Sequence, residues 1–333
     1  MKRILFIVCT LTLFACGNNS ADKPDLEGSS IPEIMAMQKK VEENPEDPAA
    51  YIRLAQAYYA YEGYDEAIQI IQRAISLDNS QARYHQMLSD VYFQYNKSLD
   101  ALTTIQKASA LFPDSLDVQI DLAKKQNYLK QYEQSLQTLN RVVSANMAND
   151  MVYYMLGTNY RYLGQSEKAL ANLKVATELN ADNLLAYQDL AIMCDTLGQD
   201  VLSLQYFDNA LRVDSTNMMT LFARGDFHNR RLQDKDAIKW YRKVAKHNRD
   251  YAEPYFNIGL IYMDSDSIAQ ANKHFNMVVE IEPTHSLGYY YRGLSAQMLG
   301  DKVSAINDYK QALNINPDLS RAAKALRDLG ENN

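Results

Sequence analysis

The sequence predicts an all-α protein built as a solenoid of tandem helical hairpins. From Pro48 to Leu319 the 333-residue chain divides into eight successive blocks of 34 residues, with no insertion or deletion. The chain contains only 12 Gly and 8 Pro, which argues against long loops. A repeat of this length marks a helical hairpin that buries its apolar face by stacking on its neighbours. The predicted blocks are 48–81, 82–115, 116–149, 150–183, 184–217, 218–251, 252–285 and 286–319.

Small residues occupy two fixed places in every block. The eighth places hold Ala55, Ser89, Ala123, Gly157, Ala191, Gly225, Gly259 and Gly293. The twentieth places hold Ala67, Ala101, Ser135, Ala169, Ser203, Ala237, Ala271 and Ala305. Two antiparallel helices approach closely only where no large side chain lies between them, so we expect each hairpin to cross at these places. Between the two helices, Gly63, Gly164, Gly198 and Gly300 are predicted to end the first helix in a left-handed conformation.

This pattern resembles the tetratricopeptide repeat (TPR) family. Residues 50–78, AYIRLAQAYYAYEGYDEAIQIIQRAISLD, are close to a consensus repeat, and the resemblance extends over 48–319. It implies a right-handed superhelical solenoid whose first helices line a concave groove that binds segments of other proteins. It does not imply a cofactor.

The N-terminal residues predict export. Lys2 and Arg3 precede an apolar run from Ile4 to Phe14, which is too short for a membrane span of about 20 residues. A basic start followed by a short apolar run is typical of a signal peptide, which we place at 1–15.

Cys16 follows this leader directly. Leu13 to Cys16 resembles the lipobox of bacterial lipoproteins, and this implies cleavage before Cys16 and attachment of diacylglycerol and a fatty acid such as palmitate to it. An ordinary secretory leader with an incidental Cys is the alternative. Gly17 stands where an Asp would favour the inner membrane, so the resemblance implies an outer-membrane lipoprotein. No acidic cluster follows Cys16, which favours the periplasmic face. Residues 16–31 are polar and rich in Gly, Ser and Asp, which predicts a flexible tether.

Helices are expected to cover both ends of the repeat array. Residues 32–47 contain an amphipathic segment with Ile34, Met37 and Val41 on one face. Residues 320–333 contain a second one, in which Leu326 faces inward and charged residues such as Arg327 face solvent. Repeat arrays need such capping elements because the terminal repeats would otherwise expose an apolar face.

Neither catalysis nor a metal site is predicted. The chain has no phosphate-binding, nucleophile-elbow, HExxH or CxxC motif, and its five His fall at unrelated places of the repeat. Cys194 is alone in the helical part and is expected to be a buried apolar residue rather than a nucleophile. The formal net charge of −7 makes nucleic acid a poor partner, because its binding depends on cationic contacts with phosphate.

Two arginines replace the usual Leu in the seventh place. Arg292 is predicted to form a structural ion pair with Asp308 on the second helix. For Arg224 the matching residue is Trp240, and a stacking contact is the corresponding expectation.

The function class follows from the exposed places of the first helices. Aromatic residues, Met and Arg are enriched on protein-recognition surfaces. The fifth places hold no Lys, so the carboxylate clamp of some TPR proteins is not expected, and a segment held by stacking and hydrogen bonds fits better. We therefore expect a protein-binding scaffold or adaptor of the bacterial envelope. The alternative is a nutrient- or glycan-binding lipoprotein on a TPR frame. The candidate groove residues are Tyr59, Phe93, Asn127, Tyr128, Tyr154, Arg161, Tyr162, Phe222, Asn229, Arg230, Phe256, Asn257 and Tyr290.

Overall fold

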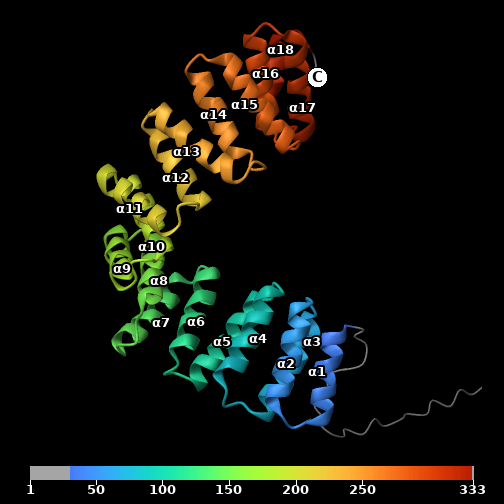
Figure 1. The fold of residues 1–333 in the computed structure, drawn as a ribbon, viewed down its shortest axis with the longest axis vertical. Helices are drawn as coiled ribbons and strands as arrows, with labels where there is room; N and C mark the ends of the chain where they lie inside the picture. Colours follow the sequence, from blue (N-terminus) through green and yellow to red (C-terminus); the bar gives the residue numbers. More distant parts are fainter. Residues whose placement is uncertain (1–30, 332–333) are drawn as a thin grey trace, which may run out of the picture. The chain divides into compact units, whose positions relative to one another are not determined.

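A computed structural model describes residues 31–331, and every regular element in this range is an α-helix. Figure 1 shows helical hairpins within each part of the chain, in which a helix is followed by one that runs back beside it. The predicted signal peptide, Cys16 and the tether up to residue 30 lie outside the described residues. Among the described helices, none has the length and apolarity needed to cross a membrane.

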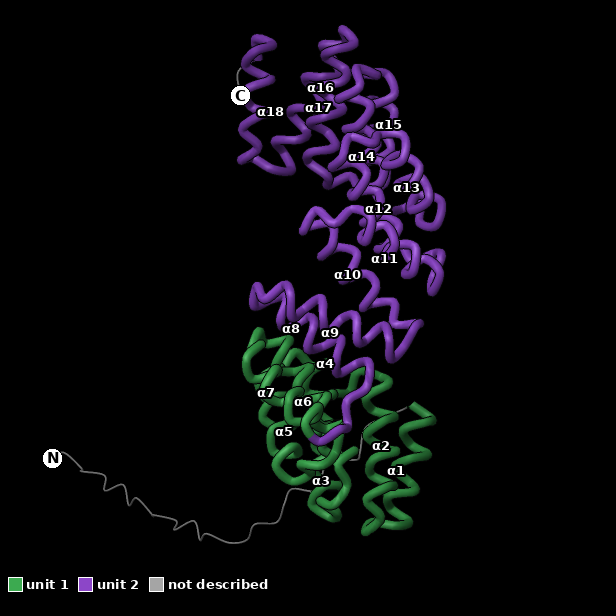
Figure 2. Tube along the Cα trace, turned by 90° about the vertical axis from the view of Figure 1, so that its left-hand side faces the viewer, with its two compact units in different colours: residues 1–144 green, residues 145–333 purple. Residues whose placement is uncertain are grey.

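The chain divides into two compact units, with the boundary between Ser144 and Ala145 (Figure 2). In the N-terminal unit each helix packs on the one before it and the one after it. Its helices are α1 (Pro32–Glu43), α2 (Pro48–Ala60), α3 (Tyr64–Leu77), α4 (Ala82–Gln94), α5 (Ser98–Leu111), α6 (Leu116–Tyr128) and α7 (Tyr132–Ser144).

The C-terminal unit follows the same rule of sequential packing from its first helix to its last. Its helices are α8 (Asp150–Tyr162), α9 (Ser166–Leu179), α10 (Leu184–Thr196), α11 (Asp200–Val213), α12 (Met218–Arg230), α13 (Asp234–His247), α14 (Glu253–Asp264), α15 (Ile268–Ile281), α16 (Ser286–Met298), α17 (Lys302–Ile315) and α18 (Ser320–Asp328).

The small residues do lie where the two helices of a hairpin meet. The Oγ atom of Ser89, in an eighth place, donates to the carbonyl of Ala101, in a twentieth place, at 2.8 Å. Where the eighth place is Gly, the ring or branched side chain of the second helix fills the space. A Cβ atom on Gly157 would lie 2.6 Å from Cγ of Leu173, which a folded protein does not tolerate.

The turn inside each hairpin has one left-handed residue, always at the fifteenth place. The prediction is confirmed for Gly164, Gly198 and Gly300, which have φ of 71°, 70° and 89°. It is wrong for Gly63, which has φ of −74°, because the preceding Glu62 takes the left-handed conformation instead. The other repeats place Asn96, Lys130, Leu232 and Asp266 in the same conformation.

In seven of the eight loops that follow a second helix, the first residue after the helix has an extended φ between −126° and −146°. In five of them an Asn or Asp just after the second helix accepts a hydrogen bond from the backbone two residues on, as Asp78 does from Ser80 at 2.9 Å. Asp78 has an extended φ of −146°. The residue at this place in the loop 145–149 is Asn146, and its φ is 55°. The boundary between the two units falls in this loop.

Helices α1 and α18 cover the outer sides of the first and last repeats. Helix α1 packs on α2 and buries Ile34 and Val41. Helix α18 packs on α17 and buries Ala322 and Leu326, while Arg327 remains exposed.

Candidate functional site

The candidate residues lie on the first helices of the repeats, at the fifth, sixth, twelfth and thirteenth places. We call the side of each unit formed by these places, together with the second and ninth, its first-helix face. In the N-terminal unit this face belongs to α2, α4 and α6, and in the C-terminal unit to α8, α10, α12, α14 and α16.

The first-helix face of the N-terminal unit contains a pocket of about 470 Å³. It lies along α2 and α4 and reaches α6 at Asp121. Its lining combines apolar side chains with amides, carboxylates and one Arg. The lining residues are Ile52, Gln56, Tyr59, Arg83, Tyr84, Gln86, Met87, Asp90, Val91 and Asp121.

Hydrogen bonds between neighbouring repeats fix the polar groups of this pocket. Gln86 donates through Nε2 to Oδ2 of Asp121 at 2.7 Å. Lys125 donates to Asp90 at 2.5 Å, and its ammonium lies 5.2 Å from the ring centroid of Phe93. Burial, together with the nearby Tyr64 and Asp90, raises the pKa of Tyr59, so its hydroxyl keeps its proton and can donate.

Aromatic side chains continue this face beyond the pocket. Phe93 and Tyr128 meet edge to face, with ring centroids 4.6 Å apart. Tyr128 is 59% exposed, whereas Phe93 and the neighbouring Asn127 are half-buried. A partly exposed aromatic pair beside fixed hydrogen-bonding groups offers both stacking area and directional contacts to a bound chain.

In the C-terminal unit, the predicted residues of α8 face the next repeat. Arg161 forms an ion pair with Asp189 of α10 at 3.1 Å. Asp189 is only 9% exposed, and burial raises its pKa although Arg161 acts in the opposite direction. Burial and the charge of Asp189 raise the pKa of Tyr154 to about 12. Tyr162, which is 56% exposed beside Arg161, is the part of this group most open to a partner.

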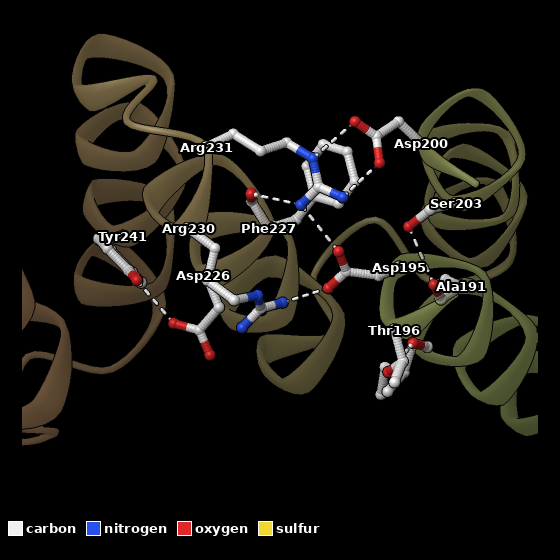
Figure 3. A network of polar contacts seen from close by, with 11 residues as sticks. Ala191, Asp195, Thr196, Asp200, Ser203, Asp226, Phe227, Arg230, Arg231 and Tyr241 are labelled. Atoms are coloured by element: carbon white, nitrogen blue, oxygen red, sulfur yellow. Dashed lines mark hydrogen bonds and ion pairs between the residues drawn. The ribbon is translucent and has the colours of Figure 1, made fainter. Parts of the chain in front are cut away.

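A second set of ion pairs joins α10 and α12 (Figure 3). Asp195 accepts from Arg230 and, at 2.8 Å, forms an ion pair with Arg231. Arg231 also donates through Nε to Asp200 at 2.8 Å, and its guanidinium lies 3.7 Å from the ring centroid of Phe227. Arg230 therefore holds two repeats together, whatever else it contacts.

Two other predicted residues of this unit, Phe222 and Tyr290, pack among aromatic rings. Phe222 contacts the rings of Tyr241 and Tyr251, at centroid distances of 5.4 Å and 5.8 Å. Tyr290 packs on Tyr291 and Tyr309. Phe222 and Tyr290 keep part of their surface exposed, as do Asn229 and Asn257.

Phe256 is buried, which differs from the prediction that it is an exposed groove residue. It was expected to face a partner, but it is only 9% exposed and packs against Phe275, His285 and Tyr291. The ring therefore belongs to the core of the C-terminal unit, where the large residues of α15 and α16 surround it.

The seventh-place arginines behave as predicted. Arg292 donates to both carboxylate oxygens of Asp308, at 2.9 Å and 2.7 Å, and to Asn276 at 2.7 Å. The guanidinium of Arg224 lies 4.3 Å from the ring centroid of Trp240. Its ion pair with Asp208, one repeat back, was not predicted. Cys194 is buried, and burial raises the pKa of its thiol, as expected for an unreactive core residue.

Sequence reasoning missed Arg83, Gln86, Met87 and Asp121 as pocket residues. They stand at the second, fifth and sixth places, next to those that were chosen. The side chains in the described range provide hydrogen bonds, charges and aromatic rings, and no group of three or more His, Cys, Asp or Glu there is placed to hold a metal ion.

Comparison with known proteins identifies the repeat. Models of the tetratricopeptide repeat match residues 34–91, 152–183, 252–285 and 286–319. The chain thus contains tetratricopeptide repeats, which in general serve protein–protein interaction rather than catalysis, and its helical hairpins have the fold of a TPR solenoid. The comparison with curated proteins gave no match.

Solved structures with the same fold come from several sources. The C-terminal part of a TPR repeat-containing protein from Cytophaga hutchinsonii is 17% identical, with a TM-score of 0.61 over 74% of this chain and 99% of that chain. A tetratricopeptide repeat protein from Parabacteroides merdae is 15% identical, with a TM-score of 0.52 over 75% and 99%. A chain of the APC/C hetero-tetramer Cut9–Hcn1 is 12% identical, with a TM-score of 0.51 over 89% and 59%. At these identities the likeness concerns the fold alone.

Proposed function

We propose that this chain is a membrane-anchored scaffold or adaptor of the bacterial cell envelope that captures segments of partner proteins on its first-helix faces. The observation that carries the proposal is the pocket of the N-terminal unit, which lies on the face where TPR repeats are expected to bind. Its hydrogen-bonding groups are already positioned by neighbouring repeats, so a partner segment would not need to order them. The Cut9–Hcn1 structure is an example of this fold within an assembly of different chains.

The lining of the pocket defines the kind of segment that fits. Asp90 and Asp121 accept hydrogen bonds, Tyr59 donates one, and Met87 and Ile52 provide apolar surface. We expect an extended or helical segment with an apolar side chain for the pocket and an amide or cationic group facing the two carboxylates.

Capture of partners tests this proposal directly. The full chain, cross-linked in the envelope and purified, should retain a reproducible set of envelope proteins. The triple variant Gln56→Ala, Arg83→Ala, Tyr128→Ala removes exposed side chains of the first-helix face and should lose that set, with little change in helix content.

A matched control distinguishes the face from any exposed surface. Gln106→Ala, Lys107→Ala and Leu111→Ala remove exposed side chains of α5, which is a second helix of the same unit. This control should capture partners as the unmodified chain does. Equal capture by both variants would show that the first-helix face of the N-terminal unit is not the working surface.

The anchor at Cys16 rests on the sequence and has its own test. Cys16→Ser should abolish metabolic labelling with a fatty acid and should move the protein from the membrane to the soluble fraction. Labelling that persists in the Cys16→Ser variant would contradict the anchor, and it would leave the pocket experiment unaffected.

A further inference from the structure

One repeat is strongly basic although the chain as a whole has a negative net charge. The sixth repeat, 218–251, contains nine Lys or Arg and four Asp or Glu, although the whole chain has a net charge of −7. The repeat therefore has a net charge of +5, and the rest of the chain has a net charge of −12. Five of its nine cations lie on α13.

Five cations of α13 lie on one face of the helix, which we call the basic face. They stand at positions i, i+4, i+7, i+8 and i+11, and at about 100° per residue these positions fall within an arc of about 100°. The opposite side of α13 is buried through Ala237, Tyr241 and Val244. The stripe is about 17 Å long, at about 1.5 Å per residue. The five residues are Lys235, Lys239, Arg242, Lys243 and Lys246, and all are exposed.

No carboxylate in the described residues forms an ion pair with any of these five cations. Arg242 donates to the hydroxyl of Tyr262 at 3.0 Å. Lys243 lies 3.9 Å from the ring centroid of Trp240, which Arg224 contacts as well. Burial and the nearby Lys239 and Arg224 lower the pKa of Lys243. Like charges three or four residues apart destabilise a helix, so this arrangement costs stability unless an anion offsets it.

An exposed apolar side chain stands in the turn just before α13. Leu232, two residues before α13, is 86% exposed and has a φ of 55°. The same place in other repeats holds Gly, Asn, Asp, Glu or Lys. A branched apolar residue is strained in the left-handed conformation, and its exposure gains nothing from the folded chain itself.

We propose that the basic face, with Leu232 at its end, binds a membrane surface rich in anionic lipid headgroups. Four of the five cations are Lys, which act as mobile point charges and suit a fluid layer of anions better than the fixed geometry of one bound group. Leu232 supplies an apolar contact for the layer beneath the headgroups. This inference rests in part on the proposed function, since the lipidation proposed at Cys16 would bring the chain to a membrane and hold the basic face near its headgroups.

Vesicle binding by residues 31–331 tests this inference, because all the described helices pack within this range. Its sole Trp, Trp240, lies beside the basic face and reports binding without a label. We expect co-sedimentation with phosphatidylcholine vesicles that contain about a third phosphatidylglycerol, a change in Trp240 emission, and at least about tenfold weaker binding to pure phosphatidylcholine. Raising the salt to about 0.5 M should release the protein, since screening shortens the reach of the charges.

Two variants with the same change in net charge locate the effect. Lys235→Gln, Lys239→Gln, Lys243→Gln and Lys246→Gln together should weaken binding to the anionic vesicles about a hundredfold. The control replaces four exposed lysines of other helices: Lys107→Gln, Lys174→Gln, Lys273→Gln and Lys324→Gln. It should change binding less than about threefold. Equal loss in both variants would overturn the proposal, because net charge alone would then explain the binding.

Leu232→Gly provides a variant that leaves every charge in place. It should weaken binding to the anionic vesicles about fivefold, because the apolar contact is lost. Helix content should be unchanged. If the protein ignores the vesicles but binds duplex DNA or polyglutamate through the same lysines, the lipid assignment is wrong. That result would leave the pocket and Cys16 untouched, since this segment lacks Cys16 and the lysine variant retains the pocket.

Discussion

The first-helix faces of the two units use the same repeat places for different purposes. In the N-terminal unit these places line a pocket, and Tyr59 and Asp90 reach its surface. Pairs between successive repeats occur in both units, but those of the N-terminal unit, such as Lys125 with Asp90, border the pocket. In the C-terminal unit the twelfth and thirteenth places are themselves taken up by such pairs: Arg161 with Asp189, and Arg230 with Asp195. The place of a residue in the repeat therefore determines the direction of its side chain. Whether that side chain remains accessible depends on the residues that the next repeat places opposite it.

The twelfth place illustrates the difference. It holds Tyr59 in the first repeat, and in the fourth and fifth repeats it holds Arg161 and Asp195. The two charged residues find partners of opposite charge on the following first helix. In these two pairs the Asp side chain is at most 13% exposed, so they should influence stability more than a pair exposed on both sides, such as Arg53 with Asp47.

Among the variants that test this comparison, Asp195→Ala should have the largest effect on stability. The Asp195 side chain is only 8% exposed and pairs with both Arg230 and Arg231. Its removal leaves Arg230 without this partner and leaves Arg231 with Asp200 and the carbonyl of Phe227. We expect a loss of about 2–3 kcal/mol in the free energy of unfolding of the C-terminal unit. Urea unfolding followed by Trp240 fluorescence measures it, because Trp240 belongs to this unit.

Arg53→Ala is the matched change in the N-terminal unit. Arg53 is paired with Asp47 at 3.3 Å, and both side chains are well exposed. We expect a change within about 0.5 kcal/mol, measured by urea unfolding and circular dichroism. If this variant is destabilised as much as Asp195→Ala, the contrast between the two units does not hold.

Titration of two carboxylates should change the stability of the two units with pH, by a smaller amount and in opposite directions. Burial raises the pKa of Asp189, so ionising it costs stability as the pH rises above its ordinary value of 3.8. The hydrogen bond from Tyr95 lowers the pKa of Asp65 in the N-terminal unit, so its contribution is present above that value and is lost as the pH falls through the lowered pKa.

Two variants isolate these contributions. From acid towards neutral pH, the urea midpoint of the wild type should fall relative to Asp189→Asn, and it should rise relative to Asp65→Asn. The comparison of each variant with the wild type cancels the titration of the other carboxylates. Parallel slopes for the two variants would contradict the assigned environments.

Features that depend only on residues within one repeat could be predicted from the sequence. Helix crossing at Gly157 depends on the facing Leu173, which lies in the same repeat and at a fixed spacing, so period and residue size predict it. The seventh-place pair of Arg292 and Asp308 was predictable for the same reason. Gly63 shows the limit of this approach, since Glu62 adopts the left-handed conformation although a Gly stands next to it.

Features that depend on two repeats, or on a whole surface, were harder to predict. Arg230 and Asp195 lie 35 residues apart, and neither residue alone indicates that the pair forms. Phe256 looked like other fifth-place aromatics, but the rings around it place it in the core. The net negative charge of the whole chain gave no indication of the basic face, although the helical spacing of its lysines can be seen in the sequence.

A modest effect of the same sign in both units concerns the left-handed place that they share. Lys130, in the N-terminal unit, has a φ of 59°, and Leu232, in the C-terminal unit, has a φ of 55°. Replacing either by Gly removes the strain of a Cβ atom in this conformation, at about 1–2 kcal/mol, and increases the entropy of the unfolded chain by about 0.5–1 kcal/mol. Both Leu232→Gly and Lys130→Gly should therefore stabilise their units by up to about 1 kcal/mol in urea unfolding. A gain from Lys130→Gly without one from Leu232→Gly would mean that the Leu232 side chain stabilises the folded unit through contacts of its own. In that case the side chain would not be available to contact a membrane.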